Sequence, residues 1–249
     1  MKKIFTLTLF FFGITTALYA AEPRAFQEGN DFYKEAQVDR ALESYVSAND
    51  SGWESSALYF NIGNCYFKKK EWGRAVLNYE KAGRLSPRDP DIAFNERLAL
   101  TRAGTPRIQE SYSVPQRLSR RLFRWITIDE ATLGLVVLYL LGLALIALSF
   151  SSAKKPAPSR YMIFAFILLF IICGIAVLYD RIVNLGRAGV IVAKTAAAKF
   201  EPSPDATTYF EVAEGMLITT IEEQKDWIKI KRSDGKTGWI PRQAREIIS

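Results

Sequence analysis

The hydrophobic residues of this chain follow three different patterns along its length. Long apolar runs lie at residues 1–20, 130–150 and 161–179, with charged side chains only near the start of the first two. Residues 22–104 instead repeat an amphipathic helical spacing, and residues 186–249 alternate apolar and polar positions over short stretches. The pattern therefore predicts a multi-domain protein with an all-α part, apolar helices and a C-terminal all-β part.

The first apolar run is typical of a signal peptide. Residues 1–20 begin with Lys2 and Lys3, continue with apolar residues, and end in small ones at Ala20 and Ala21. A basic start, an apolar middle and small residues at the cleavage point are the features of secretory signals. We expect the following residues to be exported, whether the segment is cleaved or kept as an anchor.

The other two apolar runs predict transmembrane helices at 130–150 and 161–179. Each has about the 20 apolar residues that cross a bilayer core of roughly 30 Å. Thr127 and Glu130 fit a capping box at the start of the first helix. The loop 151–160 would then be cytoplasmic, and its basic residues agree with the positive-inside rule. We therefore expect a bacterial inner-membrane protein with two spans and periplasmic N- and C-terminal domains.

Four arginines precede the first span and disagree with that rule. Within residues 112–126 the apolar side chains share one helical face and the arginines line the other. Such a segment can lie in the headgroup plane against anionic lipid. We expect residues 112–126 to form an amphipathic interfacial segment in contact with the lipid membrane.

The amphipathic helices repeat with a period of about 34 residues. Residues 56–89 place small residues where two helices would touch and tyrosines between them, at Gly63, Tyr66, Ala75 and Tyr79. The preceding residues 22–55 carry the same pattern at Gly29, Phe32, Ala41, Tyr45 and Ala48. This spacing resembles the tetratricopeptide repeat, a pair of helices stacked in arrays. A third helix, 90–104, has Asp89 as its N-cap, Pro90 in its first turn and a stop at Gly104, and would cap the array.

Stacked repeats expose a concave surface that binds partners. The first helix of each repeat would line it with aromatic, amide and basic side chains. These candidate groove residues are Phe26, Asn30, Tyr33, Lys34, Phe60, Asn61, Asn64, Phe67, Lys68, Phe94, Asn95 and Arg102. An asparagine amide can bond both the N–H and the C=O of an extended peptide. Two repeats and a cap are fewer than the usual minimum of three, so we expect added stability from a membrane helix or a partner.

The C-terminal residues 186–249 predict a small barrel of about five short strands, with a hairpin turn at Asp234-Gly235. Glu214-Gly215 before one strand, Trp227 opening the next and Gly238-Trp239-Ile240 after the turn resemble the bacterial SH3 domain. Some relatives of that kind bind cell-wall peptides and others only pack against neighbours. Trp227 and Trp239 are the candidate ligand contacts, although Trp239 fits a position in the barrel core better.

Composition argues against catalysis. The 249 residues include no histidine, which removes the commonest general base and metal ligand. Cys65 and Cys173 lie in different segments and offer neither a disulfide framework nor a metal site. The net charge is +7, with the basic excess beside the apolar runs and not on a domain face, so we expect no nucleic-acid partner. We expect no enzyme activity and no cofactor.

Signal segment, repeats, two apolar helices and a terminal SH3-like domain, in this order, resemble the BatE-type proteins of the Bacteroides aerotolerance (Bat) family. The resemblance implies a non-catalytic scaffold in a bacterial envelope complex for oxygen or stress tolerance. It also implies von Willebrand factor A-type membrane proteins and a MoxR-type ATPase as partners. An alternative from the residues is a cell-wall adaptor that binds peptidoglycan through the SH3-like domain.

Overall fold

The computed structural model describes residues 22–105, 127–151 and 187–248, together with single positions between 165 and 175. The predicted signal peptide at 1–20 and the interfacial segment at 112–126 lie outside the described residues. Nearly all of the predicted loop 151–160 does so too.

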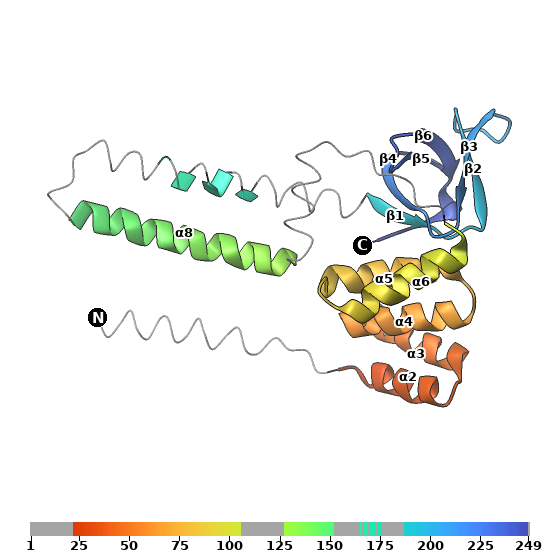
Figure 1. The fold of residues 1–249 in the computed structure, drawn as a ribbon, viewed down its shortest axis with the longest axis horizontal. Helices are drawn as coiled ribbons and strands as arrows, with labels where there is room; N and C mark the ends of the chain where they lie inside the picture. Colours follow the sequence, from red (N-terminus) through yellow and green to blue (C-terminus); the bar gives the residue numbers. More distant parts are fainter. Residues whose placement is uncertain are drawn as a thin grey trace.

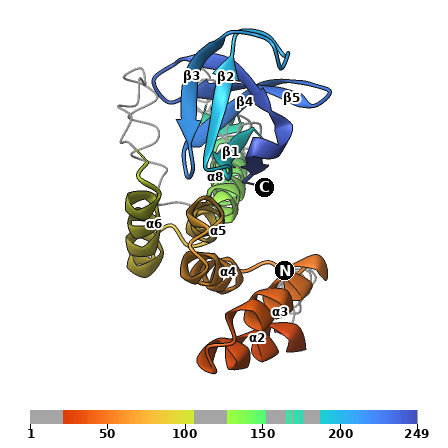
Figure 2. The ribbon, with the colours of Figure 1, turned by 90° about the vertical axis from the view of Figure 1, so that its right-hand side faces the viewer.

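The N-terminal part is a stack of antiparallel helices. In chain order they are α2 (Arg24–Lys34), α3 (Val38–Asp50), α4 (Ser56–Lys68), α5 (Trp72–Leu85) and α6 (Pro90–Ala103). Each helix packs against the next along the chain, and Figures 1 and 2 show the stack running from α2 at one end to α5 and α6 at the other. The helices therefore form a layered α domain with two distinct ends.

A glycine sits opposite a tyrosine in each of the first two helix pairs. A Cβ added to Gly29 would lie 2.6 Å from the Tyr45 ring, and one added to Gly63 would lie 2.7 Å from Tyr79. Both tyrosines are almost fully buried. The two pairs are thus packed in the same way, because a missing side chain on one helix makes room for a ring on the other.

Local signals fix several helix ends. The Ser55 hydroxyl accepts a hydrogen bond from the backbone N–H of Leu58 and so caps α4. The Asp89 carboxylate does the same for the start of α6, as predicted. Gly104 ends α6 with φ of 69°, a left-handed conformation that favours glycine.

The C-terminal part is a strongly curved antiparallel sheet of seven strands, two more than expected. Its strands are β1 (Ala188–Ile191), β2 (Thr195–Lys199), β3 (Thr208–Ala213), β4 (Leu217–Gln224), β5 (Trp227–Arg232), β6 (Thr237–Pro241) and β7 (Arg245–Ile247). The order across the sheet is β3-β2-β6-β5-β4-β1-β7. The predicted hairpin turn joins β5 to β6, with Gly235 at φ of 92°. One face of the sheet encloses a core of small and branched side chains that includes Ile218, Ile228 and Ile240.

The two domains share a core. Val190 of β1 and Ile248, just after β7, are buried among the helical residues and not in the centre of the sheet. Strand β1 packs against α5, and Figure 1 shows the β domain resting on the α5 end of the stack. The β domain therefore covers one end of the short array, a contact that the sequence did not indicate.

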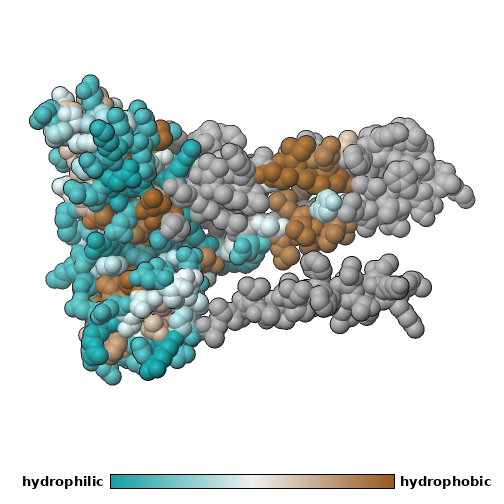
Figure 3. Space-filling view, turned by 180° about the vertical axis from the view of Figure 1, so that it is seen from behind, coloured by the Kyte–Doolittle hydropathy of each residue, from teal (hydrophilic) through white to brown (hydrophobic). Residues whose placement is uncertain are grey.

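Helix α8 (Ile128–Ser151) starts with the predicted capping box. The Thr127 N–H donates to Glu130 Oε2 at 3.0 Å, and the Glu130 N–H donates to Thr127 Oγ1 at 3.1 Å. Both guanidinium Nη atoms of Arg88 also contact the Glu130 carboxylate at 3.0 Å, which ties α8 to the loop before α6. Figure 3 shows the apolar surface of α8 beside the domains, and Leu133 is 64% exposed.

The prediction of two membrane spans is contradicted. Within the described parts of the chain, no helix is long and apolar enough to cross a membrane. Of residues 161–179, only scattered positions are described. The inner-membrane localisation with periplasmic domains, which rested on these spans, is withdrawn.

Candidate functional site

Helices α2 and α4 lie side by side and present a polar surface, to which we give the name repeat face. The Asn61 Nδ2 donates a hydrogen bond to Asn30 Oδ1 at 2.9 Å. Further along the two helices, the Lys68 ammonium stands 4.0 Å from the centre of the Tyr33 ring. These contacts bring four of the predicted groove residues together. With Asn64 they make up the repeat face.

Buried tyrosines orient the asparagines of this face. The Tyr45 hydroxyl donates to Asn30 Oδ1 and the Tyr79 hydroxyl donates to Asn64 Oδ1, each at 2.8 Å. Burial raises the pKa of both phenols well above the ordinary value, so both stay protonated and act as donors. Each repeat therefore carries the same tyrosine–asparagine pair.

The hydrogen bond from Tyr79 limits the contacts that the Asn64 amide can make to a peptide. We expected its amide to bond both the N–H and the C=O of a peptide, but Oδ1 already accepts from Tyr79. Among the described residues nothing bonds its Nδ2, and the side chain is partly exposed. Asn64 can therefore donate to a peptide carbonyl with its N–H groups.

Three predicted groove aromatics have other roles. Phe26 is 4% exposed and packs against Trp53, with ring centres 4.8 Å apart, so it belongs to the core. Phe67 is half-buried against Trp72 at 5.0 Å. Phe60 is half-buried beside Tyr79 at 5.8 Å. These three rings therefore pack against other aromatic side chains of the helical domain.

The remaining predicted groove residues do not belong to the repeat face. Lys34 is exposed and forms an ion pair with Asp31 at 3.0 Å. On α6, Arg102 is exposed, Asn95 is half-buried, and Phe94 is 58% exposed. Helix α6 packs against α5, and Phe94 supplies the most exposed aromatic ring of the helical domain.

The β domain has a cleft of about 330 Å³ beside Trp227. Trp227 and Pro241 form its apolar wall, and Lys199 contributes a cation whose Nζ is 5.9 Å from the Trp227 ring centre. The other lining residues are small or polar: Ala193, Thr195, Ala196, Ala197, Gln243 and Ala244. Trp227 thus lines a cleft, as a ligand contact would.

Trp239 of β6 is buried, as we expected of a residue that anchors the barrel. It pairs with Lys199 of β2 and Lys229 of β5, and its side chain is only 6% exposed. The Lys229 ammonium lies 5.7 Å from the centre of its ring. Trp239 therefore has little surface to offer a ligand.

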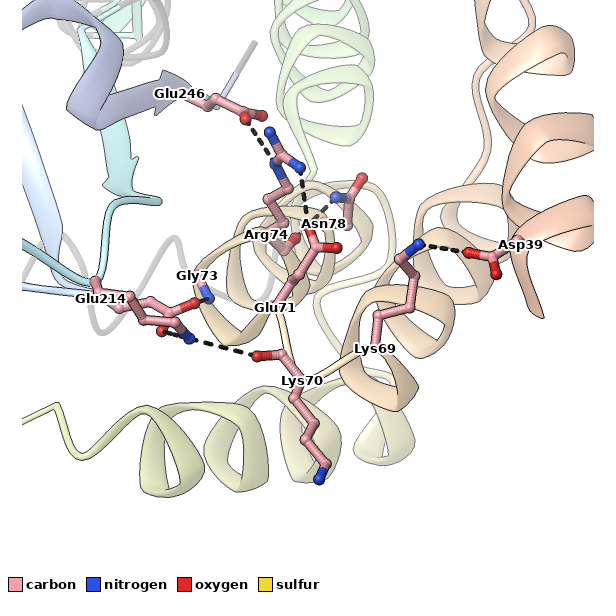
Figure 4. Close-up of polar contacts among 10 residues, drawn as sticks. Asp39, Lys69, Lys70, Glu71, Gly73, Arg74, Asn78, Glu214 and Glu246 are labelled. Carbon is pink, nitrogen blue, oxygen red and sulfur yellow. Dashed lines mark hydrogen bonds and ion pairs between the residues drawn. The ribbon is translucent and has the colours of Figure 1, made fainter.

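The junction of the two domains holds polar residues that sequence reasoning missed. Figure 4 shows Glu214 reaching from the β domain to the backbone of Gly73 at the start of α5. A small cleft of about 220 Å³ lies there, lined by Glu71, Arg74, Val192, Lys194 and Glu214. The sequence offered one signal, an acidic residue directly before the turn glycine Gly215, but not what it contacts.

Comparison with known proteins identifies the β domain only. Residues 199–244 match the bacterial SH3 domain family. No curated protein matches the chain. This match shows that the C-terminal part of the chain contains a bacterial SH3-like domain.

Proposed function

We propose that this protein is a non-catalytic scaffold that binds an extended peptide of a partner protein on the repeat face. The observation that carries this proposal is the tyrosine–asparagine pair found in both repeats. Tyr45 and Tyr79 hold Asn30 and Asn64 through Oδ1, and no other described residue accepts a hydrogen bond from either Nδ2, so these groups can donate. Donors that are oriented before binding reduce the entropy lost when a peptide is captured.

The charge at the edge of the face favours an acidic peptide or a free carboxylate. Lys68 is exposed there, close to Tyr33. A carboxylate beside this cation gains charge-assisted hydrogen bonds, which are stronger than neutral ones.

The test uses the full chain and a displayed library of random peptides. Peptides selected on the parent protein are measured against Asn64→Ala and against Glu43→Ala, an exposed position on α3. Loss of a buried hydrogen bond costs about 1–3 kcal/mol, and 1.4 kcal/mol is a factor of ten. We expect Asn64→Ala to weaken binding about tenfold or more and Glu43→Ala to leave it unchanged.

Equal binding by Asn64→Ala and parent would refute the repeat face as the site. Loss of binding accompanied by unfolding would be uninformative for that variant, so Lys68→Ala provides a second probe at an exposed position. Acidic peptides should lose affinity for Lys68→Ala, and that loss should shrink at high salt.

The finer identity of the partner rests on the Bat resemblance. It names von Willebrand factor A-type proteins and a MoxR-type ATPase of an aerotolerance complex as candidates. Affinity purification of the intact protein from its host, followed by mass spectrometry, tests this. Recovery of such proteins with the parent but not with Asn64→Ala supports both the partners and the site.

A second candidate function is binding of cell-wall peptide in the Trp227 cleft. The bacterial SH3 match and the cleft itself favour it. A pull-down of the full chain with purified peptidoglycan should then retain the parent and lose Trp227→Ala. Retention of both variants, or of neither, would remove this candidate.

A further inference from the structure

Helix α5 starts without a cap from its own segment. Glu71, the residue before its first turn, makes no side-chain capping bond, whereas Ser55 and Asp89 cap α4 and α6. The first N–H groups of a helix have no partner within the helix and need an acceptor. The Gly73 N–H finds one in Glu214 Oε1 at 2.9 Å, from the other domain.

Glu214 is a buried carboxylate with contacts on both domains. Its side chain is 6% exposed, and Oε2 accepts from the Lys194 ammonium at 2.6 Å. Its backbone oxygen accepts from Thr105 Oγ1 at 2.5 Å, just after α6 ends. A single residue thus touches the start of α5 and the end of α6, and Figure 4 shows its reach to Gly73. A negative charge at a helix N-terminus also interacts favourably with the helix dipole.

The backbones of the two domains meet at Gly73. A Cβ there would lie 2.6 Å from the Ile191 backbone oxygen and 3.0 Å from the Cα of Val192. Both distances are below the contact limit for carbon, and backbone atoms cannot turn aside as a side chain can. Gly73 is therefore required by the interface and not by its own helix.

Further contacts surround this point. Arg74 Nε donates to Glu246 at 3.1 Å, and Arg84 Nη1 donates to the backbone oxygen of Ile248 at 2.7 Å. Val190 and Ile248 are buried in the helical core. Polar bonds along α5 thus enclose an apolar contact, which is the arrangement of a stable interface.

We propose that Glu214 is an interdomain latch that makes the SH3-like domain the terminal cap of the helical array. While Glu214 keeps its contacts, α5 and the β domain unfold together, and their amide groups become exposed to solvent in the same step. Without it, the first turn of α5 loses its acceptor, and the helix can fray while α2 and α3 at the far end stay folded.

Hydrogen exchange of the full chain, followed by mass spectrometry, tests the latch. Peptides from α5, β1 and α2–α3 are compared in the parent, Glu214→Ala and Glu246→Gln, the last being a matched change in the more exposed Arg74 pair. Loss of an N-cap costs about 1 kcal/mol, with a range that extends to 2. We expect amides of α5 and β1 to exchange about five- to tenfold faster in Glu214→Ala, with α2–α3 unchanged.

A further variant and the pattern of exchange decide the case. If Glu214→Ala does not fold, Glu214→Gln is measured instead. It keeps an acceptor for Gly73 but loses the charge that faces Lys194, and exchange of α5 should rise by a smaller factor. Unchanged exchange of α5 in the variant that folds would overturn the latch, and so would an equal rise in α2–α3, which would mean general destabilisation. Equal effects of Glu214→Ala and Glu246→Gln would also overturn it.

Discussion

Single side chains decide how closely the helices approach. Gly63 and Gly83 are both helical glycines, but their surroundings differ. A Cβ on Gly63 would lie 2.7 Å from the buried Tyr79 ring, whereas one on Gly83 would meet only Ile92 Cγ2 at 3.7 Å, an ordinary contact. The same ring that excludes a side chain at Gly63 also holds Asn64 through its hydroxyl.

Alanine at these two glycines should therefore have opposite effects. Gly63→Ala overpacks the helix pair and should lower the free energy of unfolding by about 1–3 kcal/mol. Gly83→Ala should raise it by up to about 1 kcal/mol, because alanine favours the helix. Urea unfolding of the full-length variants measures both. A Gly63→Ala protein as stable as Gly83→Ala would contradict the packing described for Tyr79.

Helices α5 and α6 meet through two acidic side chains. The Glu96 carboxyl of α6 hydrogen-bonds the Glu80 carboxyl of α5, and burial together with the Glu80 charge raises the pKa of Glu96 to about 8. Neighbouring Arg97 acts in the opposite direction. The folded protein thus holds a proton that the unfolded chain, with an ordinary pKa near 4.5, releases.

This proton makes the α5–α6 contact sensitive to pH. Below about pH 4.5 both states are protonated and the contact is at full strength. As pH rises from there to about 8, the stability that the proton provides is lost. We expect the parent to lose more melting temperature between pH 5 and pH 8 than Glu96→Gln, which keeps a neutral side chain throughout. Parallel pH profiles for the two proteins would show that Glu96 carries no raised pKa.

Much of the element layout was readable from the sequence. Helix spacing, the caps at Asp89 and Thr127, and the Asp234-Gly235 turn follow from local rules and stand in the structure. Positions that depend on contacts between distant segments were not readable. Phe26 was assigned to a surface, and the role of Glu214 was missed, because each is set by a partner far along the chain.

The apolar run at 130–150 shows the limit of hydropathy. It forms most of α8, as a helix was predicted there, but no helix of the described residues meets the requirements of a membrane span. The capping box at Thr127 and Glu130 correctly identified a helix start, but a capping box indicates only where a helix begins.

At the scale of the whole molecule, the helical array and the SH3-like domain depend on one another. Val190 and Ile248 of the β domain fill the end of the helical core. Full burial of such side chains contributes about 1.5–3 kcal/mol each. A fragment of residues 22–105 would leave that end open to water.

The isolated fragment 22–105 should therefore unfold at a clearly lower temperature than the helices of the full chain. Far-ultraviolet circular dichroism at the helical wavelength follows both. Val190→Ala in the full chain should shift the helical transition toward that of the fragment, although the substitution is in a strand. A fragment as stable as the full chain would mean that the β domain does not complete the core.

The scaffold proposal is tested most directly by where a bound peptide lies. A photo-crosslinking amino acid is placed at Tyr33, half-buried on the repeat face, or at Leu85, 43% exposed at the end of α5. Both variants of the full chain are irradiated with a peptide selected on the parent. Binding on the repeat face predicts a crosslink from position 33 and little from position 85, with the first abolished by Asn64→Ala. Equal crosslinks from both positions, or a crosslink from 33 that survives Asn64→Ala, would contradict it.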